Sequence, residues 1–107
     1  MKTVPMKRIT IIGDESVRYR IVKEIHEMGA TGYTDSIVHG WGTTGVRPRH
    51  GEPANAKIEV IATPEVAQRI LEHLAQHYFE HYALIAFLDD VEVLRGEKFG
   101  AQTLTKG

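Results

Sequence analysis

The chain has 107 residues, no cysteine and a formal net charge of −1 at pH 7. This length predicts one domain over residues 1–107, with a core at about 7–95 and a polar C-terminal tail at 96–107. The absence of cysteine excludes disulfide scaffolds, and the near-neutral charge favours neither nucleic acid nor an anionic membrane as partner. Without an apolar run of bilayer length or a signal-peptide core, we expect a cytoplasmic protein.

The first third of the chain alternates strand and helix signals. Residues 7–12 are short and rich in β-branched side chains, which predicts a strand. Asp14 or Ser16 can cap a helix whose apolar residues recur at helical spacing until Gly29 stops it. A second strand is predicted over residues 33–38.

A long loop, residues 40–53, follows this second strand. It holds four of the ten glycines, two of the four prolines, and both Arg47 and Arg49. Glycine backbones let N–H groups approach an anion closely, and arginine binds phosphate or carboxylate with paired hydrogen bonds. The loop therefore predicts an anion site that responds to ligand. A disordered surface loop is the alternative interpretation.

The rest of the chain repeats the pattern of strand, helix and strand. Residues 56–61 predict a third strand, and Thr63 followed by Pro64 predicts the start of a second helix. Residues 84–88 predict a fourth strand, and a short apolar segment follows at 91–95. The order βαββαβ predicts an α+β fold, a ferredoxin-like sandwich with two helices on one face of an antiparallel sheet.

The predicted fourth strand is apolar on both of its faces. A sheet with helices on one side normally shows polar residues on the other side, but residues 84–88 have none. We therefore expect the second face to be covered by other copies of the chain. Partial exposure of Ile85 and Phe87 in a monomer is the alternative.

Five motifs occur in an order that is typical of one protein family. They are Gly29-Ala30-Thr31-Gly32-Tyr33-Thr34, Val38-His39-Gly40-Trp41-Gly42, Ala56-Lys57-Ile58-Glu59-Val60, the run Tyr78-Phe79 through Tyr82-Ala83-Leu84-Ile85, and Glu92-Val93-Leu94. With them the chain, over about residues 7–100, resembles the PII-like signalling proteins. It is most similar to their branch associated with carboxysomes and bicarbonate transport.

The resemblance implies a homotrimer that binds adenine nucleotide in clefts between its subunits, at the base of the loop that the family calls the T-loop. It also implies regulation through partner binding, with no catalytic residues and no metal, and a response linked to bicarbonate. The partner would be a bicarbonate transporter or a carboxysome-related protein. AMP, ADP, ATP and cyclic AMP are the ligands of that branch.

The resemblance also implies which loop residues bind the nucleotide. The backbones of Gly40 and Gly42 would donate to the phosphates, and Arg47 would pair with them electrostatically. Trp41 would stack on a base or anchor the loop in a groove, and we favour the anchor.

Strand residues would complete the implied nucleotide site. Thr34, Glu59 and Ile61 would line the adenine and the ribose. The segment that closes the cleft from the next subunit would contribute Leu88, Asp89, Asp90 and Arg95.

The chain also departs from the family pattern. Classical PII proteins hold the β- and γ-phosphates with a loop that bears glycine and lysine, but residues 77–82 contain neither. The terminal phosphates of a triphosphate would lack the glycine backbone and the lysine that bind them in classical PII proteins, so ADP or AMP is the expected ligand. Between residues 41 and 52 no tyrosine is available for uridylylation. Residues 101–107 lack the cysteines of a redox switch.

Two further functions remain as alternatives. His73, His77 and His81 recur every four residues, a spacing that can bind a transition metal, so a trimeric metal-binding protein of the same architecture is the second hypothesis. Nothing obvious completes the ligand set, and we expect solvated histidines on a helix face. A nucleotide hydrolase is the third hypothesis. Asp89 and Asp90 should point to opposite faces of a strand, which argues against their acting together as general acid and general base.

Overall fold

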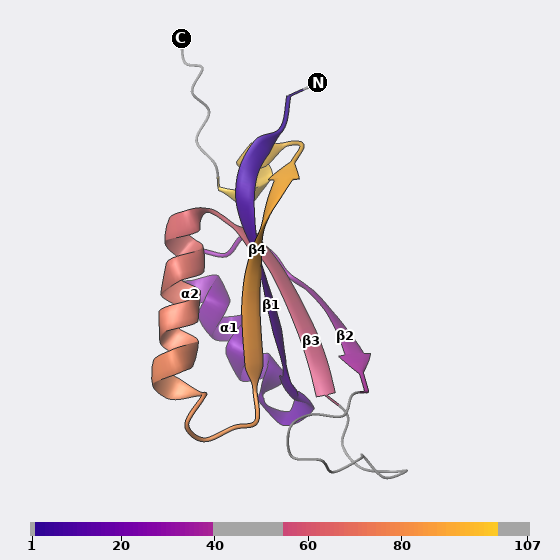
Figure 1. Ribbon diagram of the computed structural model, residues 1–107, viewed down its shortest axis with the longest axis vertical. Helices are drawn as coiled ribbons and strands as arrows, with labels where there is room; N and C mark the ends of the chain where they lie inside the picture. The colour runs from indigo at the N-terminus through magenta and orange to yellow at the C-terminus, as the bar shows by residue number, and fades with distance from the viewer. Residues whose placement is uncertain (1, 40–54, 101–107) are drawn as a thin grey trace.

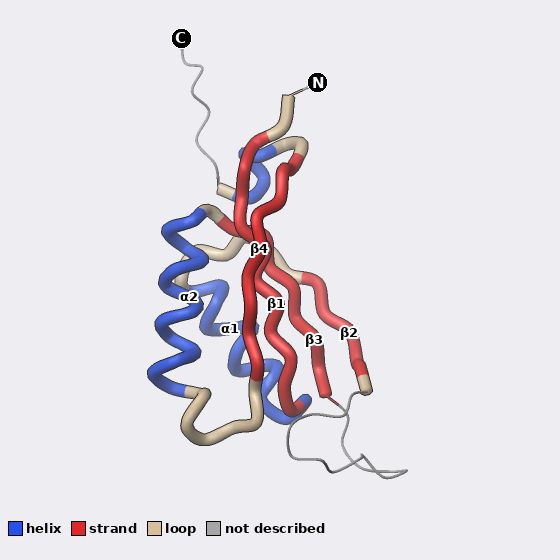
Figure 2. Tube along the Cα trace, in the orientation of Figure 1, coloured by secondary structure: helices blue, strands red, loops and turns tan. Residues whose placement is uncertain are grey.

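The computed structural model describes residues 2–39 and 55–100 as one antiparallel sheet with two helices on one face (Figures 1 and 2). The elements in chain order are β1 (Val4–Asp14), η1 (Glu15–Val17), α1 (Arg18–Glu27), β2 (Thr34–Val38), β3 (Asn55–Ala62), α2 (Pro64–His77), β4 (Ile85–Val93) and η2 (Gly96–Phe99). The strand order is β2-β3-β1-β4. The predicted ferredoxin-like arrangement is confirmed.

Local signals set the ends of α1. The Asp14 side chain accepts a hydrogen bond from the Ser16 backbone N–H at 2.8 Å and caps the 3-10 turn η1, which continues directly into α1. Gly29 ends the helix with a φ of +113°, a left-handed conformation that glycine adopts without strain. The chain then turns back towards the sheet and enters β2.

The start of α2 also follows its sequence. Thr63 is the N-cap, and its hydroxyl accepts from the Val66 N–H at 3.3 Å, while Pro64 occupies the first helical position. Along the helix, Ile70 and Leu74 are completely buried against the sheet. The cap and the apolar stripe together fix which face of α2 packs inwards.

Strand β4 is longer than predicted. It runs without a break from Ile85 to Val93, so the expected separate segment at 91–95 is wrong. The acidic pair in the middle of the strand stays in the ladder because each carboxylate has a cationic partner on β1: Asp89 bonds to Arg8 and Asp90 to Lys7.

The polar tail predicted from residue 96 onwards begins with an ordered segment. Residues 96–99 form the short helix η2, and Gly96 is buried against β1. A Cβ at this position would lie 2.7 Å from the Val4 side chain, so a larger residue would have to displace Val4. Residues 4–6 of β1 and 91–93 of β4 pair beyond the end of β3, and η2 packs on the ribbon that they form.

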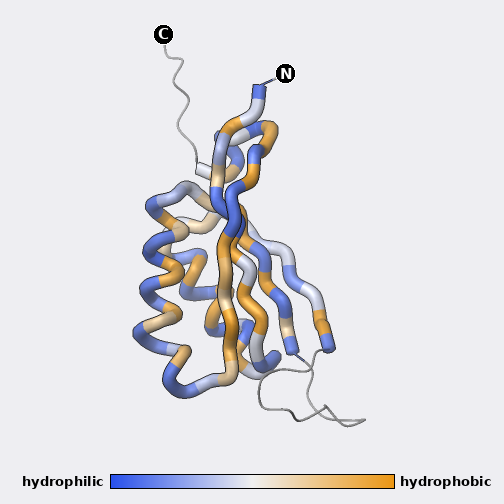
Figure 3. The backbone as a smooth tube through the Cα atoms, viewed as in Figure 1, coloured by the Kyte–Doolittle hydropathy of each residue, from blue (hydrophilic) through white to orange (hydrophobic). Residues whose placement is uncertain are grey.

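The two faces of the sheet differ. The helix side holds the core, in which Ile9, Ile11 and Val60 are at most 1% exposed. The opposite face is open in the protomer, with Ile85 58% and Phe87 50% exposed, and hydrophobic residues follow one another along the first half of β4 (Figure 3). No helix in the described ranges has both the length and the apolar character needed to span a membrane.

Candidate functional site

Four of the predicted nucleotide-binding residues share the open face of the sheet. Thr34 on β2 lies directly opposite Glu59 on β3. Ile61 belongs to the same side as Glu59, because their neighbours on β3 are buried beneath the helices. Asp89 on β4 completes the group, since both it and Ile61 lie opposite Arg8 in the central strand. The register thus aligns residues that are far apart in the sequence.

Arg8 is a residue of this face that the sequence analysis missed. Its Nε and Nη2 donate to the two carboxylate oxygens of Asp89 at 3.1 and 2.8 Å. These paired hydrogen bonds raise the pKa of Arg8, with a smaller contribution from Glu59, and lower the pKa of Asp89. Both groups are therefore held charged, and the carboxylate of Asp89 has a fixed direction.

Leu88 and Asp90 lie on the other side of β4. Leu88 is opposite the buried Ile9, and Asp90 is opposite Lys7. Because β4 is an edge strand, both side chains remain at the rim of the sheet, and Leu88 is 40% exposed. The structure therefore brings Asp89, but neither Leu88 nor Asp90, onto the face of Thr34 and Glu59.

Arg95 follows β4 in an unusual conformation. It is exposed, and its φ of 61° makes it the non-glycine residue with positive φ among residues 2–39 and 55–100. An L-residue in this left-handed region costs roughly 1–2 kcal/mol. Strained backbone of this kind clusters at ligand-binding and active sites.

The remaining predicted site residues, Gly40, Trp41, Gly42 and Arg47, lie outside the described residues. Strands β2 and β3 stay paired up to Val38 and Asn55. The two ends of the segment that contains these residues are consequently held side by side at one end of the sheet.

A polar network connects α1 to the end of α2. The Tyr78 hydroxyl donates to Glu24 Oε1 at 2.6 Å, and His73 Nε2 lies 2.7 Å from the same oxygen. Arg20 donates to the hydroxyls of Tyr78 and Tyr82 at 3.1 and 2.9 Å. The turn after α2 is thereby tied to α1 by side chains.

The network shifts the pKa values of its members. Partial burial by itself would raise the pKa of Glu24, but the hydrogen bonds with Tyr78 and His73 outweigh it, so the pKa falls below its ordinary value of 4.5. Burial and the negative charge of Glu24 raise the pKa of Tyr78, which is 1% exposed. Glu24 is therefore an ionised acceptor in the folded protein at neutral pH.

This arrangement predicts an acid-dependent loss of stability. A carboxyl group whose pKa is lower in the folded state stabilises the fold above its unfolded pKa, here about 4.5, and this contribution disappears as pH falls through the lower folded pKa. We expect the free energy of unfolding of Glu24→Gln to vary less between pH 6 and pH 3 than that of the wild type. Urea titrations at several pH values measure this, with Glu27→Gln on the exposed side of α1 as the control. Equal pH dependence of all three proteins would contradict the role of Glu24.

Within one protomer, His73, His77 and His81 are not gathered into the metal site that was the alternative interpretation, although the rings of His73 and His77 lie 4.6 Å apart. Helix α2 ends at His77, and His81 lies in the following turn. His73 is not the solvated residue that we expected, because its side chain is 25% exposed and bonded to Glu24. Across residues 2–39 and 55–100, no three His, Asp or Glu side chains are close enough together to hold a metal ion.

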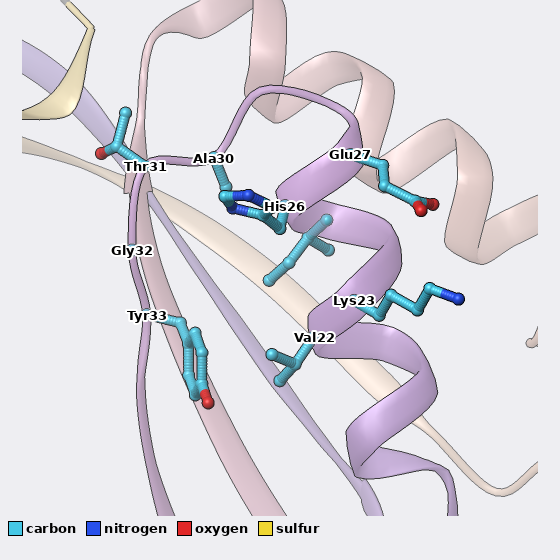
Figure 4. Close-up of a pocket in the computed structure, with 9 residues that line it drawn as sticks. Val22, Lys23, His26, Glu27, Ala30, Thr31, Gly32 and Tyr33 are labelled. Carbon is cyan, nitrogen blue, oxygen red and sulfur yellow. The ribbon is translucent and has the colours of Figure 1, made fainter.

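A cavity opens between α1 and the segment that connects it to β2 (Figure 4). Its volume is about 520 Å³, which is in the range of small-molecule sites. Apolar side chains of α1 form its floor, and the connection from Ala30 to Tyr33 forms the facing wall. The sequence analysis did not predict it, because the opening depends on how the connection leaves the helix.

A comparison with known protein families identifies the family of this chain. The family model described as nitrogen regulatory protein P-II matches residues 6–98. The chain belongs to the PII family. The resemblance inferred from the sequence motifs is confirmed, and the family is one of regulatory proteins.

Solved structures of PII-like proteins share both the fold and part of the sequence. A PII-like signalling protein of Thermus thermophilus is 42% identical, with 92% of this chain and 99% of that chain covered and a TM-score of 0.81. CPII of Thiomonas intermedia, a nitrogen regulatory PII-like protein, is 26% identical over 92% of this chain and 96% of that one, with a TM-score of 0.83. In that structure CPII is bound to ADP, AMP and bicarbonate.

Proposed function

We propose that this PII-family protein is a trimeric sensor that binds ADP or AMP together with bicarbonate. The observation that carries the proposal is the similarity to CPII, which binds these ligands and covers 92% of this chain. The sensor would regulate uptake or fixation of inorganic carbon through the segment of residues 40–54. Its protein partner would be a bicarbonate transporter or a carboxysome-related protein.

The open face of the sheet supports the trimer. Ile85 and Phe87 expose about half of their side chains on the edge strand β4, which pairs with β1 on one side. Contiguous exposed apolar side chains on one sheet face are typical of a protein–protein interface. Packing three such faces around an axis would also place the edge strand β4 of one subunit beside its neighbour.

The nucleotide would lie between two subunits. In this proposal Thr34, Glu59 and Ile61 of one subunit line the adenine and the ribose, while Gly40, Gly42 and Arg47 approach the phosphates, and Trp41 anchors the segment that carries them. The neighbouring subunit supplies the closing residues Leu88, Asp89, Asp90 and Arg95. The bond from Arg8 fixes the direction of the Asp89 carboxylate.

The turn after α2 supports ADP or AMP over ATP. Residues 77–82 contain no glycine and no lysine, and the hydroxyls of Tyr78 and Tyr82 are bonded to Arg20. The turn is thus held by α1 and offers no cationic side chain of its own except histidine. A third phosphate placed there would find little compensation for its charge.

Arg95 provides a test that separates stability from binding. Replacing Arg95 with glycine removes the left-handed strain but increases the freedom of the unfolded chain, so we expect a gain in stability of about 0.5–1 kcal/mol. If the guanidinium contacts the nucleotide, its loss should weaken ADP binding about tenfold or more. Denaturant titration and calorimetry measure the two effects, with Lys98→Ala as the nearby control. ADP affinity within twofold of the wild type would remove Arg95 from the site.

Binding of ADP and bicarbonate should be coupled. Bicarbonate has few atoms and should bind weakly alone, but a bound nucleotide would already have ordered backbone donors around it. Linkage requires each ligand to raise the affinity of the other by the same factor. Calorimetric titration of ADP with and without bicarbonate, at fixed pH and ionic strength, measures that factor. Identical ADP affinities would leave an adenine-nucleotide sensor without an inorganic-carbon response.

A further inference from the structure

The cavity beside α1 has two flat rings in its walls. His26 projects from α1 and Tyr33 from the approach to β2, and Figure 4 shows the His26 ring beside Ala30 and the Tyr33 ring facing Val22 across the space between helix and connection. The residues beneath are apolar core residues, since Ile25 is 1% and Ala30 5% exposed. Aromatic rings stack on or against other rings at favourable geometries, so these walls suit a planar apolar group.

The walls of the cavity are held in place by both helices. The Ala30 N–H donates to the carbonyl of Ile25 at 3.1 Å, which closes the end of α1. Arg69 of α2 donates to the carbonyl of Met28 at 3.1 Å. A ligand entering the cavity would therefore have little backbone to order, which removes one of the main costs of binding.

The charges around the cavity balance each other. Lys23 and Glu27 are one helical turn apart, and their charged ends point away from the opening in Figure 4. The polar groups nearest the space are the His26 imidazole and the hydroxyls of Thr31 and Tyr33. These groups favour hydrogen bonds at the edge of a ring over the binding of a strongly charged molecule.

The cavity lies on the other side of β2 from the proposed nucleotide residues. Thr34 faces the open side of the sheet together with Glu59. Tyr33 precedes it by one residue and turns towards α1, because successive side chains of an extended chain point in opposite directions. A molecule in the cavity would thus be separated by the strand from a ligand on the open face.

We propose that this cavity is a second ligand site, which binds a small, uncharged molecule with a planar apolar ring and a hydrogen-bonding edge. The ring lies over Val22 between His26 and Tyr33. This site is distinct from the proposed nucleotide site and does not depend on it.

Indole is a suitable probe, because it is planar, uncharged and carries one N–H donor. We expect titration of the full-length protein with indole to shift the backbone amide NMR signals of Ala30 and Gly32, with saturation at about 1 mM as expected for a ligand of this size. Cyclohexanol, which lacks a planar ring, should produce much smaller shifts at the same concentration. Absence of saturable shifts in these amides, or equal shifts with cyclohexanol, would overturn the proposal.

Variants locate the binding. Tyr33→Ala should weaken indole binding at least about fivefold, whereas Tyr19→Ala, which removes a 75% exposed ring of α1 that does not line the cavity, should not change it. A near-normal amide spectrum shows that Tyr33→Ala is folded, and Tyr33→Phe should retain most of the affinity. Unchanged binding to Tyr33→Ala would overturn the site.

A final titration separates this proposal from the nucleotide function. Indole binding should be the same with and without saturating ADP. Displacement of indole by ADP would show that the cavity belongs to the nucleotide site, and the proposal of a second site would then be wrong. Binding of indole by a protein that shows no affinity for ADP would support the cavity site and remove the proposed nucleotide function.

Discussion

Replacing Phe87 with aspartate is expected to dissociate the proposed trimer while each protomer stays folded. Phe87 is 50% exposed in the protomer and lies on the open face opposite Thr10, so its truncation removes little from the core. In the trimer, three new carboxylates would be desolvated near the axis, and their burial and mutual repulsion would oppose assembly. Multi-angle light scattering should give about three times 12.0 kDa for the wild type and 12.0 kDa for the variant.

Tyr19→Asp is the matched control for this experiment. Tyr19 is 75% exposed on α1, away from the open face, so the same chemical change there should leave the trimer intact. Circular dichroism of Phe87→Asp verifies that the protomer is folded. A wild-type protein that is monomeric at micromolar concentration would contradict the trimer and the inter-subunit nucleotide site together.

Removing the ring of Tyr78 should produce the largest loss of stability. Tyr78 is 1% exposed and its hydroxyl connects Arg20 to Glu24, so Tyr78→Ala both opens a cavity and leaves Glu24 with one hydrogen bond fewer. We expect a destabilisation of about 3–5 kcal/mol. Tyr78→Phe keeps the ring and should cost about 1–3 kcal/mol, because a charged acceptor loses its donor.

Urea titrations at one fixed protomer concentration measure these differences, since assembly would otherwise contribute to the apparent stability. Tyr19→Ala, at an exposed position, should change stability by no more than about 0.5 kcal/mol. If Tyr78→Phe were as stable as the wild type, the network between α1 and α2 would contribute no net stability.

The fold was predictable where a short stretch of sequence decides the structure. Thr63 and Pro64 predict the start of α2, and Gly29 predicts the end of α1, because helix caps and left-handed turns depend on one or two residues. The unbroken course of β4 was not predictable in this way. It depends on Arg8 and Lys7, which meet the acidic pair only after the strands have paired.

The same distinction applies to the candidate site. Motif resemblance selected Thr34, Glu59 and Asp89, and the register places them on one face. Arg8 was not predicted because a single arginine in a strand carries no signal of its own, and only its position opposite Asp89 gives it a role. The contact between His73 and Glu24 likewise joins residues on different helices, for which helical spacing gives no signal.

The strand order has a consequence for synthesis on the ribosome. β1 precedes the other strands of this sheet in the chain, but both of its neighbours in the sheet, β3 and β4, come later, and β4 pairs with it across about eighty residues. The central strand, with the apolar Ile9 and Ile11, must remain without strand partners until most of the chain has been translated. Long-range pairing of this kind slows folding and exposes the nascent chain to aggregation. We therefore expect this sheet to close only after β4 has been translated, and the nascent β1 to be a natural substrate for chaperones until then.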